Sequence, residues 1–347
     1  MKIPGLQQAQ RDLFVYHQRF VIKEQSQIGD VRRQVQKGLR LLGGDADLAA
    51  RASLIINELG TNLLRHAGSG GEILLRYLDQ PAPVGVEILG LDRGPGISNV
   101  TQAMTDGFST FGGKGIGLGS IRRQSDMFAI HSRVGEGTVV LSRVWQATTR
   151  LRSSQSSYQM GVISVAMPGQ TACGDGWRTA FTRGVLTILM VDGLGHGPEA
   201  ARAAKTAMRA FERQENHEIT EMLQAIHEEC HGTRGAAVAI VRIIPAEARL
   251  EFLGVGNISA GLVSAQKFSG CLSTPGIVGL GQLKLRKMEY PWDGKSLLVM
   301  HTDGLQTRWH HSDVYHMPRN PMIKAALFYR NFARGHDDAT VMVLKQG

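Results

Sequence analysis

A polar segment near the middle of the chain sets the limits on its fold. Residues 146–159, QATTRLRSSQSSYQ, are rich in Ser, Gln and Thr, and they separate two stretches with clear apolar patterns. Such a composition is typical of a linker. A chain of 347 residues with 42% apolar side chains is long enough for two cores. We therefore predict two domains, residues 1–145 and 160–347, and no internal repeat relates them.

The chain is basic, and the distribution of its charge decides what that implies. The formal net charge is +9, but no run of five or more basic residues occurs and only 6% of the residues are aromatic. These are too few aromatic side chains for obvious base-stacking surfaces. We expect a solvated basic surface and no nucleic-acid binding, with an acidic protein partner as the alternative reason for the charge.

The cysteines and the apolar runs of the sequence indicate where in the cell the protein is located. The three cysteines, Cys173, Cys230 and Cys271, form no CxxC pair, which predicts neither a disulfide framework nor a zinc cluster. No apolar run approaches the ~20 residues that span a bilayer. The segment MKIPGLQQAQRDLFVYHQRF also has no apolar signal core. We expect a soluble cytoplasmic protein with no membrane partner.

Helical periodicity marks the start of the first domain. The run FVIKEQSQIG predicts a strand that turns at Gly29 into a helix. A second helix is predicted to begin at Asp45 or Asp47 and to end at Gly68. Three strand-like runs follow: EILLRYL, VGVEILGL and TVVLSRVW. The class is α/β (α+β), and we predict an α/β sandwich with helices on one face of a mixed sheet.

The second domain is rich in short strands. Seven runs have strand character: GVISVAM, VLTILMV, AAVAIVRI, LEFLGVG, ISAGLVS, SLLVMH and ATVMVL. Two helical stretches are predicted near 198–214 and 218–231. So many strands in a domain of this size predict two packed sheets with helices outside them.

Two polar residues of the second predicted helix lie on one face. Glu58 and Asn62 are four residues apart, so one ligand could contact both. A carboxylate there could accept a proton from a hydroxyl, and an amide oxygen one turn later could bind Mg²⁺. On its own, however, an ExxxN pattern usually marks a solvated helix face.

Two later segments bring polar and glycine residues to loop positions. Asp92 ends a strand-like run, and Gly94 and Gly96 after it permit close backbone approach. The run FGGKGIGLGSI places glycines and one lysine before a helical pattern, where backbone amides would face phosphates. The candidate residues in that run are Gly113, Lys114, Gly115, Gly117 and Gly119.

These segments together resemble the GHKL (Bergerat) ATP-binding fold. The order is ExxxN on a helix, DxGxG after a strand, GxGxG before a helix, and Gly137-Thr138 opening the last strand. The resemblance covers residues 20 to 145. It implies that Glu58 activates the acceptor hydroxyl, that Asn62 holds Mg²⁺, and that Asp92 recognises adenine with help from Thr138. It also implies that residues 101–117 form a lid over the ATP phosphates.

The compact size and the ending GLGSIRRQSDMFAIHSRVGEGTVVLSRVW resemble the RsbT and anti-sigma-factor serine kinases. A histidine-kinase interpretation is weakened because no helical hairpin with a phosphoacceptor histidine precedes the module. The resemblance implies a small STAS-domain protein as substrate. A capping or surface role is at least as good an interpretation for Arg65 and His66, which follow one turn after the site.

Acidic residues recur at the strand ends of the second domain. They are Asp175 in CGDG, Asp192 in MVDGLGHG, Asp303 in HTDGL, and Asp337 with Asp338 in HDDAT. Carboxylates gathered from separate strands repel one another unless cations lie between them. Two metal ions would activate a bridging water for attack on phosphorus. Each Asp-Gly pair alone is more often an ordinary turn.

The ordered series resembles the PPM phosphatases of the SpoIIE and RsbX type, an αββα sandwich, over about residues 160 to 345. The resemblance implies that Asp192 bridges two Mn²⁺ or Mg²⁺ ions, with the Gly193 carbonyl joining them. It places Asp303 and Asp337 on one metal and Asp175 on or near the pair, and it leaves Asp338 the less certain of its doublet.

The second domain departs from that family at two places. Gly176 follows the first aspartate, where relatives have serine, and the segment 305–335 is short and His-rich. For His196, protonation of the leaving oxygen and a solvent role are equally good interpretations. We expect no catalytic role for three other histidines: His301, His310 and His311.

The combined interpretation is a bifunctional partner-switching regulator. Its kinase domain would use ATP with Mg²⁺, and its phosphatase domain two Mn²⁺ or Mg²⁺ ions, on serine or threonine of a STAS-domain protein or another switch protein. One alternative is a nucleotide-dependent module that sequesters a partner such as a sigma factor without phosphorylating it. Another makes only the second domain catalytic, with ATP as its regulator.

Overall fold

The computed structural model describes residues 15–68, 70–78, 84–105, 117–146, 157–214 and 217–347. The chain divides into two compact units, Met1–Gln155 and Ser156–Gly347. The first strand of the second unit begins at Tyr158, so the last two residues of the predicted linker, Tyr158 and Gln159, belong to this strand. Among the helices in these ranges, none combines the length and hydropathy of a bilayer-spanning segment.

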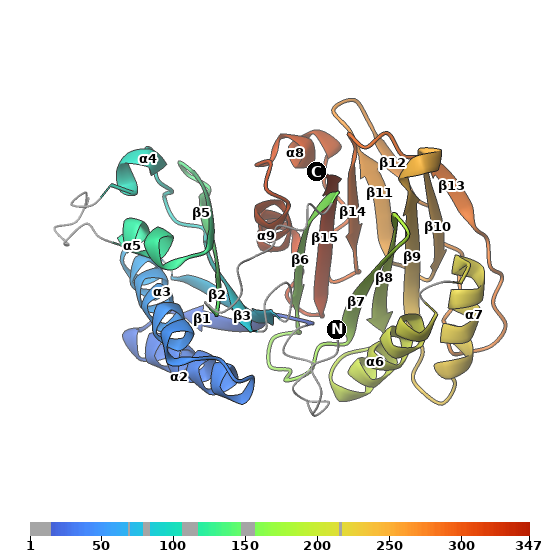
Figure 1. The fold of residues 1–347 in the computed structure, drawn as a ribbon, viewed down its shortest axis with the longest axis horizontal. Helices are drawn as coiled ribbons and strands as arrows, with labels where there is room; N and C mark the ends of the chain where they lie inside the picture. The colour runs from blue at the N-terminus through green and yellow to red at the C-terminus, as the bar shows by residue number, and fades with distance from the viewer. Residues whose placement is uncertain (1–14, 69, 79–83, 106–116, 147–156, 215–216) are drawn as a thin grey trace. The chain divides into compact units, whose positions relative to one another are not determined.

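Five strands form the sheet of the first unit, in the order β1-β2-β3-β5-β4 (Figure 1). They are β1 (Gln18–Ile22), β2 (Gly71–Leu78), β3 (Gly85–Asp92), β4 (Met127–Arg133) and β5 (Gly137–Trp145). Each pair of neighbours is antiparallel, so the predicted mixed sheet is wrong. β3 and β4 run in the same direction, but β5 lies between them and pairs with both.

Three helices of the first unit cover one face of this sheet: α2 (Gln25–Leu41), α3 (Ala46–His66) and α5 (Gly117–Gln124). The short α4 (Val100–Ala103), which follows β3 in the chain, has no buried residue. Apolar side chains of α2, α3 and α5 share one buried cluster with alternate residues of the strands, among them Ile73, Leu75 and Ile88. The α/β sandwich predicted from the sequence is therefore formed.

Local capping explains where the two long helices begin. α2 starts at Gln25, before Gly29, so the turn predicted at Gly29 is wrong. Glu24 and Gln27 form a capping box there, which satisfies backbone amides that the helix leaves free. α3 begins after Asp45, whose Oδ1 accepts from the backbone nitrogen of Leu48 at 2.8 Å.

The second unit is built on two antiparallel sheets. The first has the order β13-β10-β9-β8-β7 and the second the order β12-β11-β14-β15-β6. The strands are β6 (Tyr158–Val165), β7 (Asp175–Thr182), β8 (Val185–Gly193), β9 (Ala236–Ile244), β10 (Arg249–Val255), β11 (Ser259–Val263), β12 (Phe268–Gly270), β13 (Met288–Pro291), β14 (Leu297–His301) and β15 (Ala339–Gln346). Apolar side chains from both sheets meet in one buried cluster, so the core lies between the sheets.

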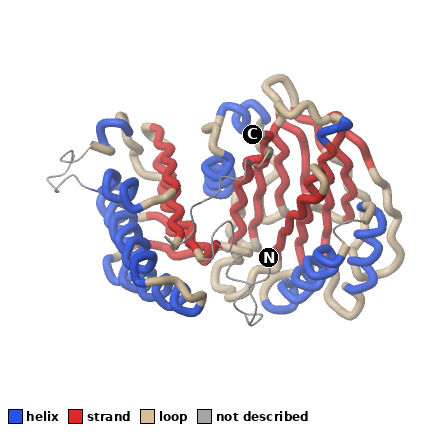
Figure 2. Tube along the Cα trace, viewed as in Figure 1, coloured by secondary structure: helices blue, strands red, loops and turns tan. Residues whose placement is uncertain are grey.

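Helices lie outside the sandwich on both sides (Figure 2). They are α6 (Pro198–Arg213), α7 (Ile219–Glu229), a 3-10 turn (Pro245–Glu247), α8 (His311–His316) and α9 (Pro321–Phe332). α6 and α7 contact β7, β8 and β9, whereas α9 contacts β6 and β15. The layers are thus helix, sheet, sheet and helix, as predicted, although α8, α9, β7, β12 and β13 were not predicted individually.

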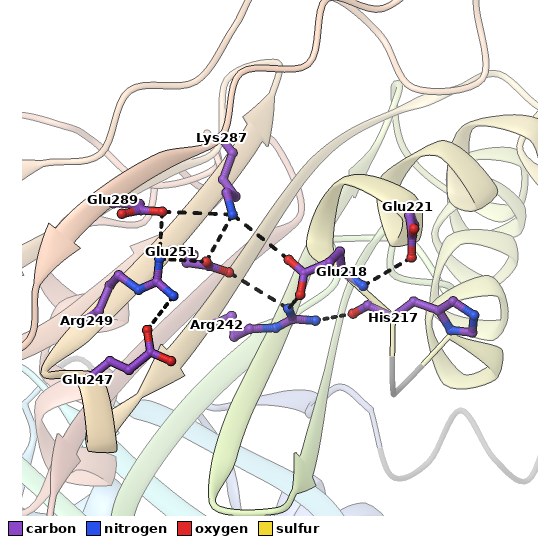
Figure 3. Close-up of polar contacts among 9 residues, drawn as sticks. All are labelled: His217, Glu218, Glu221, Arg242, Glu247, Arg249, Glu251, Lys287 and Glu289. Atoms are coloured by element: carbon purple, nitrogen blue, oxygen red, sulfur yellow. Dashed lines mark hydrogen bonds and ion pairs between the residues drawn. The ribbon is translucent and has the colours of Figure 1, made fainter.

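A charge network covers the outer face of the first sheet next to α7 (Figure 3). Glu251 of β10 lies opposite Arg242 of β9 and Glu289 of β13. Lys287 donates to Glu251 at 3.1 Å, and Arg242 donates at 2.9 Å to Glu218, the residue that caps α7. The network therefore ties the start of α7 to the sheet.

Candidate functional site

The ExxxN pair of the first unit faces the start of α5. Glu58 and Asn62 lie on α3, and both side chains are partly buried. A β-carbon at Gly117 would lie 3.3 Å from Asn62 Oδ1 and 3.4 Å from Glu58 Oε2. The carboxylate and the amide therefore meet beside the first residue of α5. Gly119, two residues further along α5, is buried.

Part of the predicted phosphate loop lies outside the described residues. This applies to Gly113, Lys114 and Gly115, and to most of the lid predicted over 101–117. The described start of the lid is α4, whose cap Asn99 accepts from the backbone nitrogen of Gln102 at 3.0 Å.

Asp92 occupies the end of β3 and organises the loop that follows. Its Oδ1 accepts from the backbone nitrogens of Gly94 at 2.8 Å and Thr138 at 3.2 Å. A β-carbon at Gly94 would lie 2.7 Å from the α-carbon of Ala67, too close for any other residue. Gly96 adopts φ of +72°, a left-handed conformation that favours glycine. The DxGxG residues and Thr138 thus converge where β3 ends and β5 begins.

Ser132 is a member of this cluster that the sequence did not reveal. Its hydroxyl pairs with Thr138 Oγ1 at 2.8 Å and accepts from the backbone nitrogen of Ile97 at 2.8 Å. The contact depends on the register of β4 and β5, in which Ser132 lies opposite Thr138. Nearby, burial and the charge of Arg65 lower the pKa of His66, and the Asp92 carboxylate opposes them.

In the second unit, the inner faces of both sheets change from apolar to polar at one end. Alternate residues of a strand share a face. Ile188 and Met190 of β8 point into the core, and Asp192 is next in that alternation. Leu298 and Met300 of β14 are followed in the same way by Thr302. The core of the sandwich therefore ends in a polar cluster.

Asp175 and Asp192 lie directly opposite each other in this cluster. They are cross-strand partners of β7 and β8, a position at which like charges destabilise a sheet. Asp175 is 2% exposed, and its Oδ2 accepts from the Thr302 hydroxyl at 2.8 Å. Burial and the charges of Asp192 and Asp338 raise the pKa of Asp175 well above its usual range. Burial, with Asp303, Asp337 and Asp338, raises the pKa of Asp192 to about 8.

The Asp337-Asp338 doublet separates into two environments. Both oxygens of Asp338 accept backbone N–H groups, from Met167 at 2.7 Å and Gly174 at 2.8 Å. Asp337 is more exposed, and its Oδ1 accepts from the nitrogen of Asp338 at 2.9 Å. Asp338 therefore fixes the loop between β6 and β7, while Asp337 retains more of its coordinating capacity.

Two further candidates border the same cluster. Asp303 follows β14, and its Oδ2 accepts from Asn257 Nδ2 at 2.7 Å. Gly193 ends β8, and a β-carbon there would collide with the carbonyl of Ala200 in α6. Glycine is therefore required for the close packing of α6 against the end of β8.

The donor set is of the kind that Mg²⁺ and Mn²⁺ bind. In the described part of the chain, no ion pair joins Asp175 or Asp192 to a lysine or arginine. Buried carboxylates without a protein cation are matched by hard cations that prefer oxygen ligands. Among the same residues, no three His, Cys, Asp or Glu side chains are grouped tightly enough to hold a metal ion alone. The carboxylate oxygens of the cluster are of the type that Mg²⁺ and Mn²⁺ prefer.

The structure shows the surroundings of Gly176 and of two histidines considered in the sequence. A β-carbon at Gly176 would lie 2.8 Å from Met208 Sδ of α6, so a serine there would require the Met208 side chain to move. His301 is 1% exposed, and burial lowers its pKa. Its Nδ1 donates to the carbonyl of Thr302 at 2.9 Å, and its Nε2 accepts from Trp309 at 3.4 Å, which fixes the neutral form. His196, in contrast, is exposed.

Comparison with known proteins assigns a family to each unit. A family model described as Histidine kinase-like ATPase domain matches residues 22–143. One described as Stage II sporulation protein E (SpoIIE) matches residues 182–346. The serine/threonine-protein kinase RsbT of Bacillus subtilis (strain 168) is 38% identical over 96 residues, which are 28% of this chain and 71% of RsbT.

Two solved structures share the fold. One, reported under the heading "The bacterial stressosome: a modular system that has been adapted to control secondary messenger signaling", is 30% identical with a TM-score of 0.52 and covers 54% of this chain and 99% of its own. RsbX in complex with magnesium is 19% identical with a TM-score of 0.51 and covers 64% of this chain and 100% of its own, a likeness of fold alone. The resemblances predicted from the sequence motifs are confirmed. The chain belongs to the RsbT serine/threonine-protein kinase family through its GHKL-type ATPase domain, and it joins to this domain a PP2C-type phosphatase domain of the SpoIIE family.

Proposed function

We propose that this protein sets the phosphorylation level of serine or threonine on a STAS-domain partner. The first domain adds phosphate from ATP and the second removes it, with residues 146–159 as the linker. Support comes from the similarity to RsbT, a serine/threonine-protein kinase, and to a structure reported for the bacterial stressosome. ATP as a substrate and three free cysteines fit a cytoplasmic location.

In the kinase domain, Glu58 is the general base. It accepts the proton of the partner's hydroxyl as the oxygen attacks phosphorus and the bond to ADP breaks. When bound, ATP with Mg²⁺ supplies the phosphoryl group and neutralises its charge. Asn62, one turn from Glu58, is the ligand for the cation, and Asp92 with Thr138 holds the adenine. The contact of Glu58 and Asn62 with Gly117 supports these roles because it brings base, metal ligand and helix terminus together.

In the phosphatase domain, Asp192 and the Gly193 carbonyl, with Asp303 and Asp337, would hold two Mn²⁺ or Mg²⁺ ions. When bound, the cations supply an activated water and neutralise the phosphoryl group. Asp175 lies behind Asp192 and is oriented by the Thr302 hydroxyl. Asn257 orients Asp303 by its hydrogen bond to Oδ2. RsbX, which shares the fold, was crystallised with magnesium.

The observation that carries the proposal is the cross-strand pair of Asp175 and Asp192 in one unit, together with the Glu58 and Asn62 pair beside Gly117 in the other. The test is sequential. The purified chain is incubated with a candidate STAS-domain protein and labelled ATP with Mg²⁺, then freed of nucleotide and given Mn²⁺. We expect the partner to gain label in the first step and lose it in the second.

Matched variants assign each step to one site. Glu58→Gln should lower label gain by about 10²- to 10⁴-fold, the range for loss of a general base, and leave label loss intact. The control Glu136→Gln changes an exposed glutamate of the same unit and should leave both steps intact. A partner captured by the wild type without ever gaining label would instead favour the sequestering module. Label gain without label loss would overturn the phosphatase half.

A further inference from the structure

A basic pocket borders the candidate metal cluster of the second unit. It has a volume of about 390 Å³ and is lined by Gln306, Thr307, Arg308, Arg334 and His336. This volume lies at the lower end of the range for ligand sites, which runs from ~300 to ~1,000 Å³. All five lining residues carry polar or cationic side chains.

Two chain segments are joined to make its walls. The backbone nitrogen of Gln306 donates to the carbonyl of Phe332 at 2.9 Å, and that of Arg334 donates to the carbonyl of Gly304 at 2.9 Å. Leu305 and Ala333 form a bridge between these two bonds. His336 Nδ1 donates to the carbonyl of Arg334 at 3.2 Å, which orients its ring. The walls are therefore fixed by backbone pairing.

The pocket is close to the metal cluster along both segments. Gln306 follows Asp303 by three residues, and His336 directly precedes Asp337. Because a chain extends by at most ~3.6 Å per residue, Gln306 lies within roughly 11 Å of Asp303. A peptide whose phosphoserine was at the cluster would reach the pocket with a side chain two or three residues away.

The charge of this pocket is not neutralised within the described chain. There, neither Arg308 nor Arg334 forms an ion pair with a carboxylate. Between Leu305 and His336 the sequence contains four arginines and one lysine but only one acidic residue, Asp313. The lysine, Lys324, is buried and donates to the carbonyls of Val314 and Met317, so it holds α8 in place and does not reach solvent. Arg308 and Arg334, the two arginines that line the pocket, are therefore available to an external anion.

We propose that this pocket binds an acidic side chain of the protein substrate, two or three residues from the phosphorylated serine or threonine. The inference rests on the proposed phosphatase function and names a specificity determinant for it. Arginine suits the task because its guanidinium binds a carboxylate through two parallel hydrogen bonds. Cations bound at the neighbouring cluster would neutralise the phosphoryl group itself, so the pocket is assigned to a residue next to the phosphoserine.

The test compares two phosphoserine peptides. One has Glu at the second and third positions on both sides of the phosphoserine, and the other has Gln there. With Mn²⁺, we expect wild-type kcat/KM to favour the Glu peptide by about two- to fivefold, the range for one solvent-accessible ion pair. In the double variant Arg308→Gln with Arg334→Gln, the ratio should fall to about one. Arg319→Gln, an exposed arginine of the same segment outside the pocket, should keep the wild-type ratio.

Other outcomes overturn the proposal. A wild-type ratio of one would do so, as would a double variant that loses activity on both peptides and keeps the ratio, because the pocket would then hold the phosphoryl group. If the wild type hydrolyses neither peptide, the phosphatase function fails, and the pocket is tested by fluorescence anisotropy with the unphosphorylated Glu peptide. Equal affinity of wild type and double variant for that peptide would then reject the pocket.

Discussion

Buried carboxylates in the two units have opposite surroundings. Glu87 on β3 is fully buried and accepts from Arg143 Nε at 2.6 Å, Arg76 Nη2 at 2.8 Å and His17 Nε2 at 3.0 Å. Burial alone would raise the pKa of Glu87, but these cations outweigh it and hold the pKa well below its usual range. Asp175 and Asp192 are surrounded by other carboxylates, and their pKa values are raised.

On the proposed function, this difference in surroundings distinguishes a carboxylate that stabilises the fold, Glu87, from one that binds metal, Asp192. A buried charge is tolerated when the protein supplies its partner, and Glu87 has such partners from two strands and the segment before β1. Glu251, with Arg242, Arg249 and Lys287 around it, is a second example (Figure 3). Asp192 has no lysine or arginine paired with it in the described chain. Its cluster stays unfavourable until cations from solution are bound, which is the property expected of a metal site.

The largest expected effect is the loss of phosphatase activity in Asp192→Asn. Removal of a residue that only orients a metal ligand costs about 10- to 100-fold, so loss of a proposed metal ligand itself should cost about 10³-fold or more in phosphoserine hydrolysis with Mn²⁺. The metal-free unfolding free energy should stay the same or rise because one repelling charge is gone. Glu228→Gln, at an exposed position of α7, is the control. If Asp192→Asn kept its activity but lost stability, Asp192 would behave as a structural charge, and the contrast with Glu87 would be wrong.

Glu87→Gln should show the opposite pattern. The substitution keeps the shape of the side chain but leaves Arg143 and Arg76 without their carboxylate. Breaking such a buried pair costs about 3 kcal/mol or more of unfolding free energy, measured by urea titration. Phosphoserine hydrolysis by the other unit should be unaffected. An unchanged urea midpoint would show that Glu87 is not the structural charge described above.

A smaller effect is expected in the pH dependence of stability. The pKa of Asp192 rises from 3.8 to about 8 on folding, so between these values the folded state binds more protons than the unfolded state. The metal-free unfolding free energy should therefore fall as pH rises from about 4 to 8, by at most ~1.4 kcal/mol per pH unit for one proton. The stability from Glu87 is present above about pH 4.5 and is lost only as pH falls further, because its pKa is lowered.

Asp192→Asn should make this slope shallower, whereas Glu87→Gln should leave it unchanged above about pH 5. The measurement is urea unfolding in chelator at several pH values. Equal slopes in wild type and Asp192→Asn would contradict the assignment of the raised pKa to Asp192.

The ends of a helix were predicted well where the sequence contains a clear capping residue. Asp45 and Gly68 mark the two ends of α3. Both signals are local, because a capping side chain and a glycine in the left-handed conformation act on backbone groups only a few residues away. The prediction of a turn at Gly29 was wrong because the capping box of Glu24 and Gln27 starts α2 earlier in the chain. β7 and β13 were missed because edge strands with charged residues lack the apolar run that marks a central strand.

The site was predictable only as far as its motifs are local. The aspartates and glycines stand in short patterns, so the sequence identified them as candidates. Ser132 and Thr302 depend on strand register and on contacts across the sandwich, which no local pattern specifies. The basic pocket joins residues on either side of α8 and α9, two helices that were not predicted, so the sequence could not place Arg308 beside Arg334.

The most direct test of the central claim is calorimetric titration of the nucleotide-free chain with Mn²⁺. We predict saturable binding in the wild type and in Glu87→Gln, and affinity weakened by about tenfold or more in Asp192→Asn. Equal Mn²⁺ affinity in Asp192→Asn and wild type, or no binding to the wild type, would contradict the assignment of the buried aspartates as a cation site.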